Sequence, residues 1–244
     1  MTSTPSKDLS RRIFLRKSVV ILPATTVALS GCAKENADGI VADGKAVAAQ
    51  NKDYQPVFFQ PAEWAFVQAA VARLIPADEI GPGALEAGVP EFIDRQMDAA
   101  FGTASLWYMQ GPYVASAPEF GYQDRQAPRD VYRAGIAATD RYCTAMLGSK
   151  TFAQLDSVAQ DKLLQALESG TVMLDGANGK AFFAFLLQNT REGYLSDPMH
   201  GGNKDAAGWK MIGFPGARAD YADWVGRPGE RYPLPPVSIR GPQG

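Results

Sequence analysis

His200 is the only histidine of this 244-residue chain, and residues 197–203 around it read Asp-Pro-Met-His-Gly-Gly-Asn. A histidine can act as a general base or bind a metal near neutral pH. No Gly-x-Ser-x-Gly motif is present to supply the nucleophile of a hydrolase. A zinc site built from one histidine and carboxylates is uncommon. The segment is typical of a turn, so the sequence gives little support to catalysis at His200.

Other patterns that carry chemistry are missing or ambiguous. Residues 81–88 hold three glycines, but their spacing and their position behind a predicted helix do not fit a dinucleotide-binding turn. The absence of Cys-x-x-Cys excludes covalent c-type haem and a four-cysteine cluster on this chain. Glu91/Arg95 and Asp94/Asp98 are spaced i,i+4 and most simply form solvated helix faces, although a glycosidase-type carboxylate pair stays open. We therefore expect no catalytic, cofactor or metal site here.

The first 31 residues predict an export signal. Arg11 and Arg12 precede Phe-Leu, further basic residues and an apolar run from about Val19 to Leu29. This order is typical of a twin-arginine signal peptide, and the run is shorter than the ~20 residues that span a bilayer. The twin-arginine route carries folded proteins, commonly with a cofactor or with a partner that holds one. Because this chain shows no cofactor motif, the leader favours a partner.

Two cysteines carry further expectations. Leu29-Ser30-Gly31-Cys32 resembles a lipobox, in which the cysteine is acylated and becomes the new N-terminus. Acylation would tether the mature chain to a membrane, whereas ordinary cleavage would discard Cys32 or leave it as a thiol. With Cys32 acylated, Cys143 has no partner in the chain, so it is either buried and inert or paired with another subunit.

Composition limits the function classes. The precursor has a formal net charge of −2, and without residues 1–31 it holds 19 basic against 25 acidic residues, which gives −6. Nucleic-acid binding needs a basic surface, so we expect no nucleic-acid partner. The hydrophobic fraction of 46% is ordinary for a globular protein.

Apolar residues at helical spacing predict a mainly α protein. We expect a flexible tether over residues 32–55, one helical domain over 56–226 and an extended, proline-rich tail over 227–244. No alternating β pattern of useful length occurs. The predicted helices cover residues 61–75, 90–101, 129–147, 155–169 and 179–195.

A long loop stands out between the second and third predicted helices. Residues 103–128 place aromatic side chains, among them Trp107 and Tyr113, between glycine, proline, serine and glutamine. Loops longer than ~12–15 residues are usually functional or disordered, and aromatic residues argue against disorder. Trp107 and Tyr113 are therefore candidate partner contacts, with packing on the chain's own core as the equal alternative.

The most distinctive text of the domain is residues 197–203 followed by residues 208–216, which read Gly-Trp-Lys-Met-Ile-Gly-Phe-Pro-Gly. Together with the leader and residues 74–78 and 185–194, it resembles the small third (gamma) subunit family of gluconate 2-dehydrogenase, over roughly residues 57–225. In that family the position of His200 is more often tyrosine. Candidate partner contacts in this text, with core packing as the alternative, are Gly201, Gly202, Asn203, Trp209 and Phe214.

The resemblance implies a noncatalytic subunit of a membrane-associated sugar, sugar-acid or polyol dehydrogenase. Its partners would be a large FAD-containing subunit of the glucose-methanol-choline type, which lacks an export signal, and a multihaem cytochrome c subunit. This chain would support folding and twin-arginine co-export of the flavin subunit to the periplasm. The alternative is a free-standing exported lipoprotein that binds a small ligand or acts as an enzyme at the His200 loop. Substrate and stoichiometry are not encoded in a recognisable motif.

Overall fold

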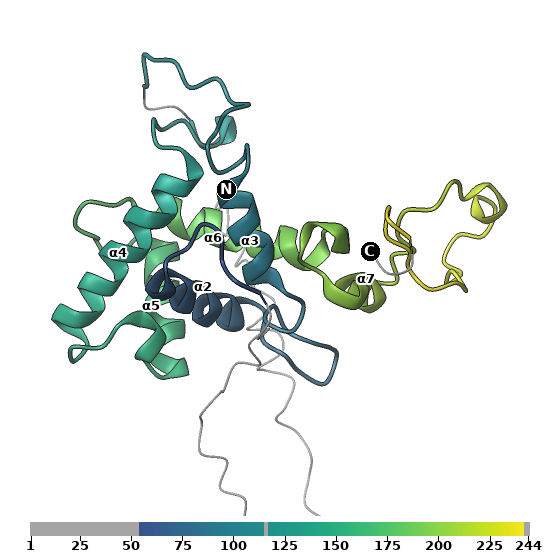
Figure 1. The fold of residues 1–244 in the computed structure, drawn as a ribbon, viewed down its shortest axis with the longest axis horizontal. Coiled ribbons are helices and arrows are strands. Elements are labelled where there is room, and N and C mark those ends of the chain that lie inside the picture. Colours follow the sequence, from purple (N-terminus) through teal and green to yellow (C-terminus); the bar gives the residue numbers. More distant parts are fainter. Residues whose placement is uncertain (1–53, 115–116, 242–244) are drawn as a thin grey trace, which may run out of the picture. The chain divides into compact units, whose positions relative to one another are not determined.

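The computed structural model describes residues 54–114 and 117–241, so Arg11, Arg12 and Cys32 lie outside the described residues (Figure 1). Within these ranges the chain forms helices and two isolated β-bridges but no β-strand, which confirms the mainly α prediction. No helix in the described ranges is both long and apolar enough to cross a membrane. The α-helices are α2 (Pro61–Leu74), α3 (Val89–Asp98), α4 (Pro128–Met146), α5 (Ser157–Ser169), α6 (Gly179–Leu195) and α7 (Ala207–Ile212).

Local capping residues account for several helix boundaries. The Asp156 carboxylate accepts a hydrogen bond from the Ala159 N–H (2.8 Å) at the start of α5, and Asn178 caps α6 in the same way. Such caps satisfy N–H groups that have no partner inside the helix. Gly170 ends α5 in the left-handed conformation, with φ of 72°. The Asn178 cap therefore explains why α6 begins at the predicted residue, and Gly170 explains why α5 ends at the predicted residue.

The second helix is shorter than the sequence predicted. It ends at Asp98 and not at Phe101, and the Gly102 N–H bonds back to the Gln96 carbonyl at 2.9 Å. A Cβ atom at residue 102 would lie 2.0 Å from the Met97 carbonyl oxygen. The chain therefore turns tightly over the end of α3, and only glycine fits this close approach.

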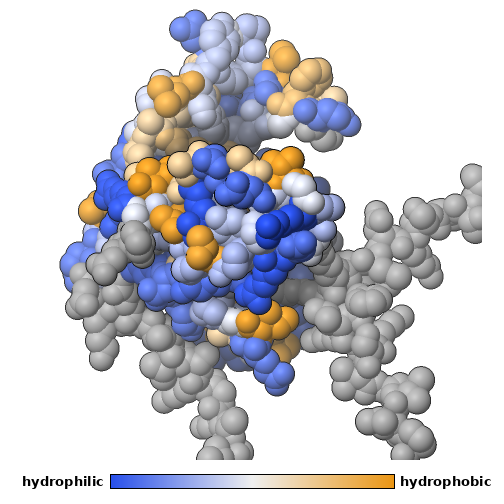
Figure 2. All heavy atoms as spheres, turned by 90° about the vertical axis from the view of Figure 1, so that its right-hand side faces the viewer, coloured by the Kyte–Doolittle hydropathy of each residue, from blue (hydrophilic) through white to orange (hydrophobic). Residues whose placement is uncertain are grey.

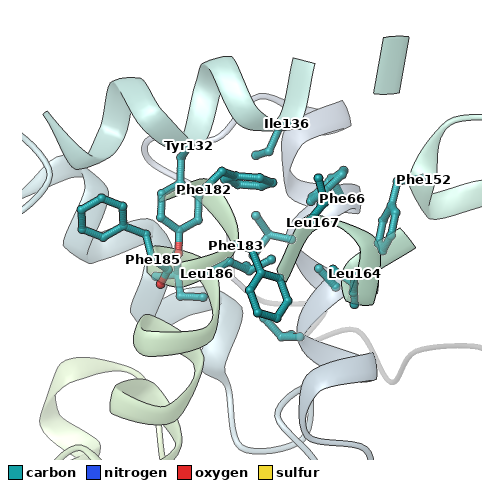
Figure 3. Close-up of a cluster of buried hydrophobic side chains, with 14 of the residues drawn as sticks. Phe66, Tyr132, Ile136, Phe152, Leu164, Leu167, Phe182, Phe183, Phe185 and Leu186 are labelled. Carbon is teal, nitrogen blue, oxygen red and sulfur yellow. Dashed lines mark hydrogen bonds between the residues drawn. The ribbon is translucent and has the colours of Figure 1, made fainter. Parts of the chain in front are cut away.

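Helix α6 forms the centre of the core and contacts α2, α3, α4 and α5. Figure 3 shows the Phe182 ring beside Tyr132 and Ile136 of α4, and Phe66 of α2 beside Phe152. The Phe66 and Phe152 ring centroids are 4.5 Å apart, a distance typical of favourable aromatic pairs. Because α6 is apolar on several sides, it can be covered by four helices at once. The loops and turns at its ends and side therefore pack on α6.

A buried carboxylate attaches the start of the domain to α3. Asp94 is fully buried and accepts hydrogen bonds from the Tyr54 hydroxyl (2.7 Å) and from the backbone N–H groups of residues 57, 58 and 59 (2.7, 3.1 and 2.8 Å). Four donors compensate for taking the carboxylate out of water. Burial and the bond to Asp94 raise the pKa of Tyr54. The expected solvated face was thus wrong for Asp94, although Asp98 is exposed.

Candidate functional site

The turn that follows α6 is built around a buried asparagine. The Asn203 side chain donates to the Ser196 carbonyl (2.7 Å) and accepts from the Gly208 N–H (2.8 Å), with no exposed surface. It therefore joins the end of α6 to the start of α7. Both sides of the amide are used, so a residue of similar size without these groups would leave buried polar atoms unpaired.

The backbone of this turn is unusual. Residues 203, 205 and 206 are not glycine, yet their φ angles are 48°, 56° and 51°. Left-handed conformations cost non-glycine residues about 1–3 kcal/mol each and are found preferentially at functional sites. Gly202 is required for a different reason, because a Cβ there would lie 2.2 Å from the Gly193 carbonyl oxygen. The turn thus lies directly on the last turns of α6.

Aromatic side chains hold the next segment against α6. The Trp209 indole N–H donates to the Leu195 carbonyl at 2.7 Å, and Trp209 is only 5% exposed. The Tyr194 hydroxyl donates to the Pro82 carbonyl at 2.6 Å. Phe214 meets Trp209 edge-on at 5.1 Å but keeps 45% of its surface exposed. Of these predicted contact residues, Trp209 belongs to the core and Phe214 remains available to a partner.

A charged cluster connects the turn to α3. Glu91 is 7% exposed and forms ion pairs with Arg95 (2.5 Å) and Lys204 (2.6 Å). The backbone N–H of Lys204 also donates to the Ala87 carbonyl, with 3.0 Å between nitrogen and oxygen. The Glu91/Arg95 pair expected from i,i+4 spacing is present, but its carboxylate is buried and not solvated. An open, polar cavity of about 430 Å³ lies beside this cluster.

The tail returns to the same turn. The Asp197 carboxylate accepts hydrogen bonds from the Ser238 hydroxyl (2.6 Å), the Ile239 N–H (2.9 Å) and the Met199 N–H (3.0 Å). Burial alone would raise the pKa of Asp197, but these hydrogen bonds and His200 outweigh it and lower the pKa. A parallel bridge joins Gly216 to Val237. The proline-rich segment is therefore held against the chain's own turn at its far end.

The long aromatic loop has a packed base and exposed apolar side chains. Trp107 stacks on Phe185 of α6 with ring centroids 6.5 Å apart, and Tyr122 meets the same ring edge-on at 4.9 Å. The Tyr113 hydroxyl donates to the Met109 carbonyl (2.6 Å), and its side chain is 41% exposed. Trp107 is thus partly covered by the core and Tyr113 lies at the surface. The most exposed large apolar side chains of the loop are Leu106, Tyr108, Val114 and Phe120.

Figure 2 shows one face of the molecule, on which apolar residues form separate orange groups between hydrophilic ones. Scattered exposed apolar residues are normal on any protein, whereas groups of them often mark interaction surfaces. The exposed apolar side chains of the described residues also include Met211, Ile212 and Phe214 around the end of α7. Together with the aromatic loop they give two surfaces that a partner could cover.

Cys143 is fully buried in α4 and forms no disulfide within the described part of the chain. Burial, and to a lesser extent the nearby Asp140, raise the pKa of the Cys143 thiol to about 12. The reactive thiolate is therefore rare at neutral pH. A disulfide to another subunit would also require α4 to move, so this geometry favours the buried, inert alternative.

The predicted site residues fall into separate places. Gly201, Gly202, Asn203, Trp209 and Phe214 gather at the C-terminal end of α6, whereas Trp107 reaches Phe185 in its middle. Ten residues of helix place these two regions about 15 Å apart. His200 is exposed in a short 3₁₀ helix, residues 198–200. Within the described ranges, no group of three His, Cys, Asp or Glu side chains is placed to hold a metal ion.

The sequence places Glu91 on a solvated helix face and Asp197 in a turn, and it does not single out Lys204 or Arg240. Glu91, Lys204 and Arg240 all line the cavity of about 430 Å³, and Asp197 fixes the tail. Three of the contacts join residues more than 40 positions apart in the sequence: Glu91 with Lys204, and Asp197 with Ser238 and with Ile239. One local feature could have indicated that Glu91 is buried: apolar residues flank it in the sequence, so it lies on a part of the helix close to the core.

The fold and this site define a mainly α protein in which polar clusters fix turns and a tail against a central helix. Residues 61–216 match the family described as gluconate 2-dehydrogenase subunit 3, and the chain belongs to this family. Membership implies a complex with a dehydrogenase subunit. Neither the comparison with curated proteins nor the comparison with solved structures found a match.

Proposed function

We propose that this chain is the noncatalytic small subunit of a membrane-associated, FAD-dependent dehydrogenase that acts on gluconate or a related sugar, sugar acid or polyol. It supports folding of the flavin subunit and carries it through the twin-arginine route. The observation that carries the proposal is the family match over residues 61–216. The leader with Arg11 and Arg12 supports the export role, because a signal on one subunit can serve a folded complex.

The surface chemistry is consistent with a subunit role. The aromatic loop leaves Leu106 and Tyr108 more than 80% exposed, while Trp107 between them anchors on α6. Large exposed apolar side chains on a rigid base suit a protein interface, where aromatic residues contribute most to binding. We assign FAD to the large partner subunit and haem c to a cytochrome subunit, so no residue of this chain is proposed to hold either group.

The proposed location is the periplasmic side of a membrane. Acylation of Cys32 would attach the mature chain directly, and a cytochrome subunit would attach the complex a second time. A multiply acylated Cys32 would itself give stable anchoring, because several lipid chains bind membranes much more strongly than a single chain.

Affinity capture of the tagged protein from detergent-solubilised membranes tests the subunit role. We expect a co-purifying subunit of flavoprotein size, a flavin absorption spectrum and dye-linked dehydrogenase activity. A colourless, monodisperse chain in good yield would reject the proposal. It would then direct attention to the exposed His200 loop as the site of a free-standing protein.

The export role is tested by replacing Arg11 and Arg12 together with lysine. We expect both this chain and the flavin subunit to remain in the cytoplasm, measured as dehydrogenase activity and antigen in each fraction. Arg16→Lys keeps the charge of the same region without touching the arginine pair and serves as the control. Normal export of the flavin subunit in the double variant would contradict the escort role.

A further inference from the structure

We propose that the cavity beside Glu91 is a carboxylate-binding site. Three separate segments build it: α3 supplies Glu91 and Arg95, the turn after α6 supplies Lys204, and the tail supplies Arg240. The lining is completed by Asp205, Pro198, Met199 and Gly201. At about 430 Å³ the cavity has room for a six-carbon sugar acid or for a side chain with its surroundings.

Charge in the cavity favours an anion. Three cationic side chains face two carboxylates, and one carboxylate, Glu91, is buried beneath Arg95 and Lys204. The Arg95 and Lys204 side chains line the cavity and remain 46% and 33% exposed, so neither is buried as Glu91 is. Within the described residues, the Arg240 guanidinium has no ion-pair partner, and the residue is exposed. The lining therefore carries more positive than negative charge at its accessible surface.

The donor chemistry of the cationic side chains points to the same ligand class. An ammonium group has three N–H donors and a guanidinium has five, and neither can accept a hydrogen bond. One Glu91 oxygen pairs with Arg95 and the other with Lys204, and each cation carries more N–H groups than this one contact needs. A carboxylate offers two oxygens and pairs with guanidinium in a bidentate way. A ligand carboxylate can therefore accept hydrogen bonds from the exposed parts of these two side chains.

The turn is held in place for such a role. Asn203 and Lys204 fix a backbone with three left-handed non-glycine residues, and Asp197 holds the tail so that Arg240 reaches the cavity. Strained backbone that several contacts maintain is a feature of binding sites. The carboxylate has two possible sources, a free sugar acid or an acidic side chain of the dehydrogenase subunit. The second source rests on the proposed function, whereas the first does not.

The first arm of the test uses hydrogen–deuterium exchange on the purified protein in its isolated form, with sodium gluconate and with glucose as the uncharged control. A free sugar-acid site predicts that gluconate, and not glucose, slows exchange in residues 198–206 and 238–241. In Arg240→Gln, the gluconate concentration needed for the same protection should rise about tenfold, as expected for loss of a charge-assisted hydrogen bond. Arg191→Gln, an exposed arginine on α6, should have no effect.

The second arm measures the dissociation constant of the complex with the dehydrogenase subunit. An acidic side chain as ligand predicts no protection by gluconate, but an increase of about tenfold in the dissociation constant for Arg240→Gln and none for Arg191→Gln. The proposal is overturned if gluconate gives no protection and both variants bind the partner like the unmodified chain. If no complex forms at all, the proposed function fails, and the gluconate arm still decides the site.

Discussion

At the scale of single residues, buried carboxylates determine how the chain segments are joined. Asp94 illustrates this, since one side chain accepts four hydrogen bonds from the segment that enters the domain. Asp94→Asn replaces an acceptor oxygen by an NH₂ group that faces backbone donors. We expect the free energy of unfolding to fall by about 2–4 kcal/mol, from lost charge-assisted bonds and an unpaired buried donor. Chemical denaturation of the purified protein measures it.

Asp98→Asn is the matched control, because Asp98 lies four residues further along α3 and is exposed. Its substitution should change the free energy of unfolding by less than about 0.5 kcal/mol. Equal effects of the two substitutions would show that Asp94 does not attach residues 54–59 to the helix.

Asp197 makes the docking of the tail depend on pH. The pKa of Asp197 in the folded chain is below its usual value of 3.8. Its contribution to holding the tail is therefore fully present above about pH 3.8 and is lost as the pH falls through the folded pKa. The Ile239 amide should therefore exchange slowly above about pH 5, and its protection should fall in strongly acidic solution. Asp197→Asn should remove this protection at every pH. Slow exchange in that variant at neutral pH would mean that other contacts hold the tail.

At the scale of elements, helices were predictable where their signals are local. Asn178 and the dense apolar residues after it define α6, and Gly170 ends α5, so these bounds follow from nearby residues alone. The turn after α6 was recognised as distinctive, but its assembly was not predictable. Glu91 meets Lys204 across 113 positions, and i,i+4 spacing alone suggests only a solvated pair. Burial of a carboxylate depends on the tertiary fold, which a local pattern does not contain.

The packing of this turn on α6 predicts a strong effect of one methyl group. In Gly202→Ala the new Cβ would lie 2.2 Å from the Gly193 carbonyl oxygen, so helix and turn must separate. We expect a loss of roughly 2 kcal/mol or more in unfolding free energy, because backbone cannot give way as a side chain can. Gly81→Ala is the control, since nothing lies within 4 Å of its Cβ position. Similar melting temperatures for both variants would contradict the close contact.

At the scale of the whole molecule, α6 carries two surfaces with different chemistry. Its middle supports the aromatic loop through Phe185, and its end supports the turn with the charged cavity through Leu195 and Gly193. A partner that covers both would combine apolar contact area with a charge-based contact. In interfaces the apolar part supplies most of the affinity, and charged contacts add specificity and faster association.

The aromatic loop gives the last prediction for the whole complex. Tyr108 and Phe120 are 82% and 71% exposed, so Tyr108→Ser with Phe120→Ser should leave the unfolding free energy nearly unchanged. If the dehydrogenase subunit covers the loop, the dissociation constant of the complex should rise tenfold or more, since buried aromatic residues contribute most to interfaces. Met173→Ser provides the control, because Met173 is 86% exposed in the segment between α5 and α6. If the double variant and Met173→Ser have equal dissociation constants, the loop is not part of the interface. The apolar surface at the end of α7 would then be the next one to test.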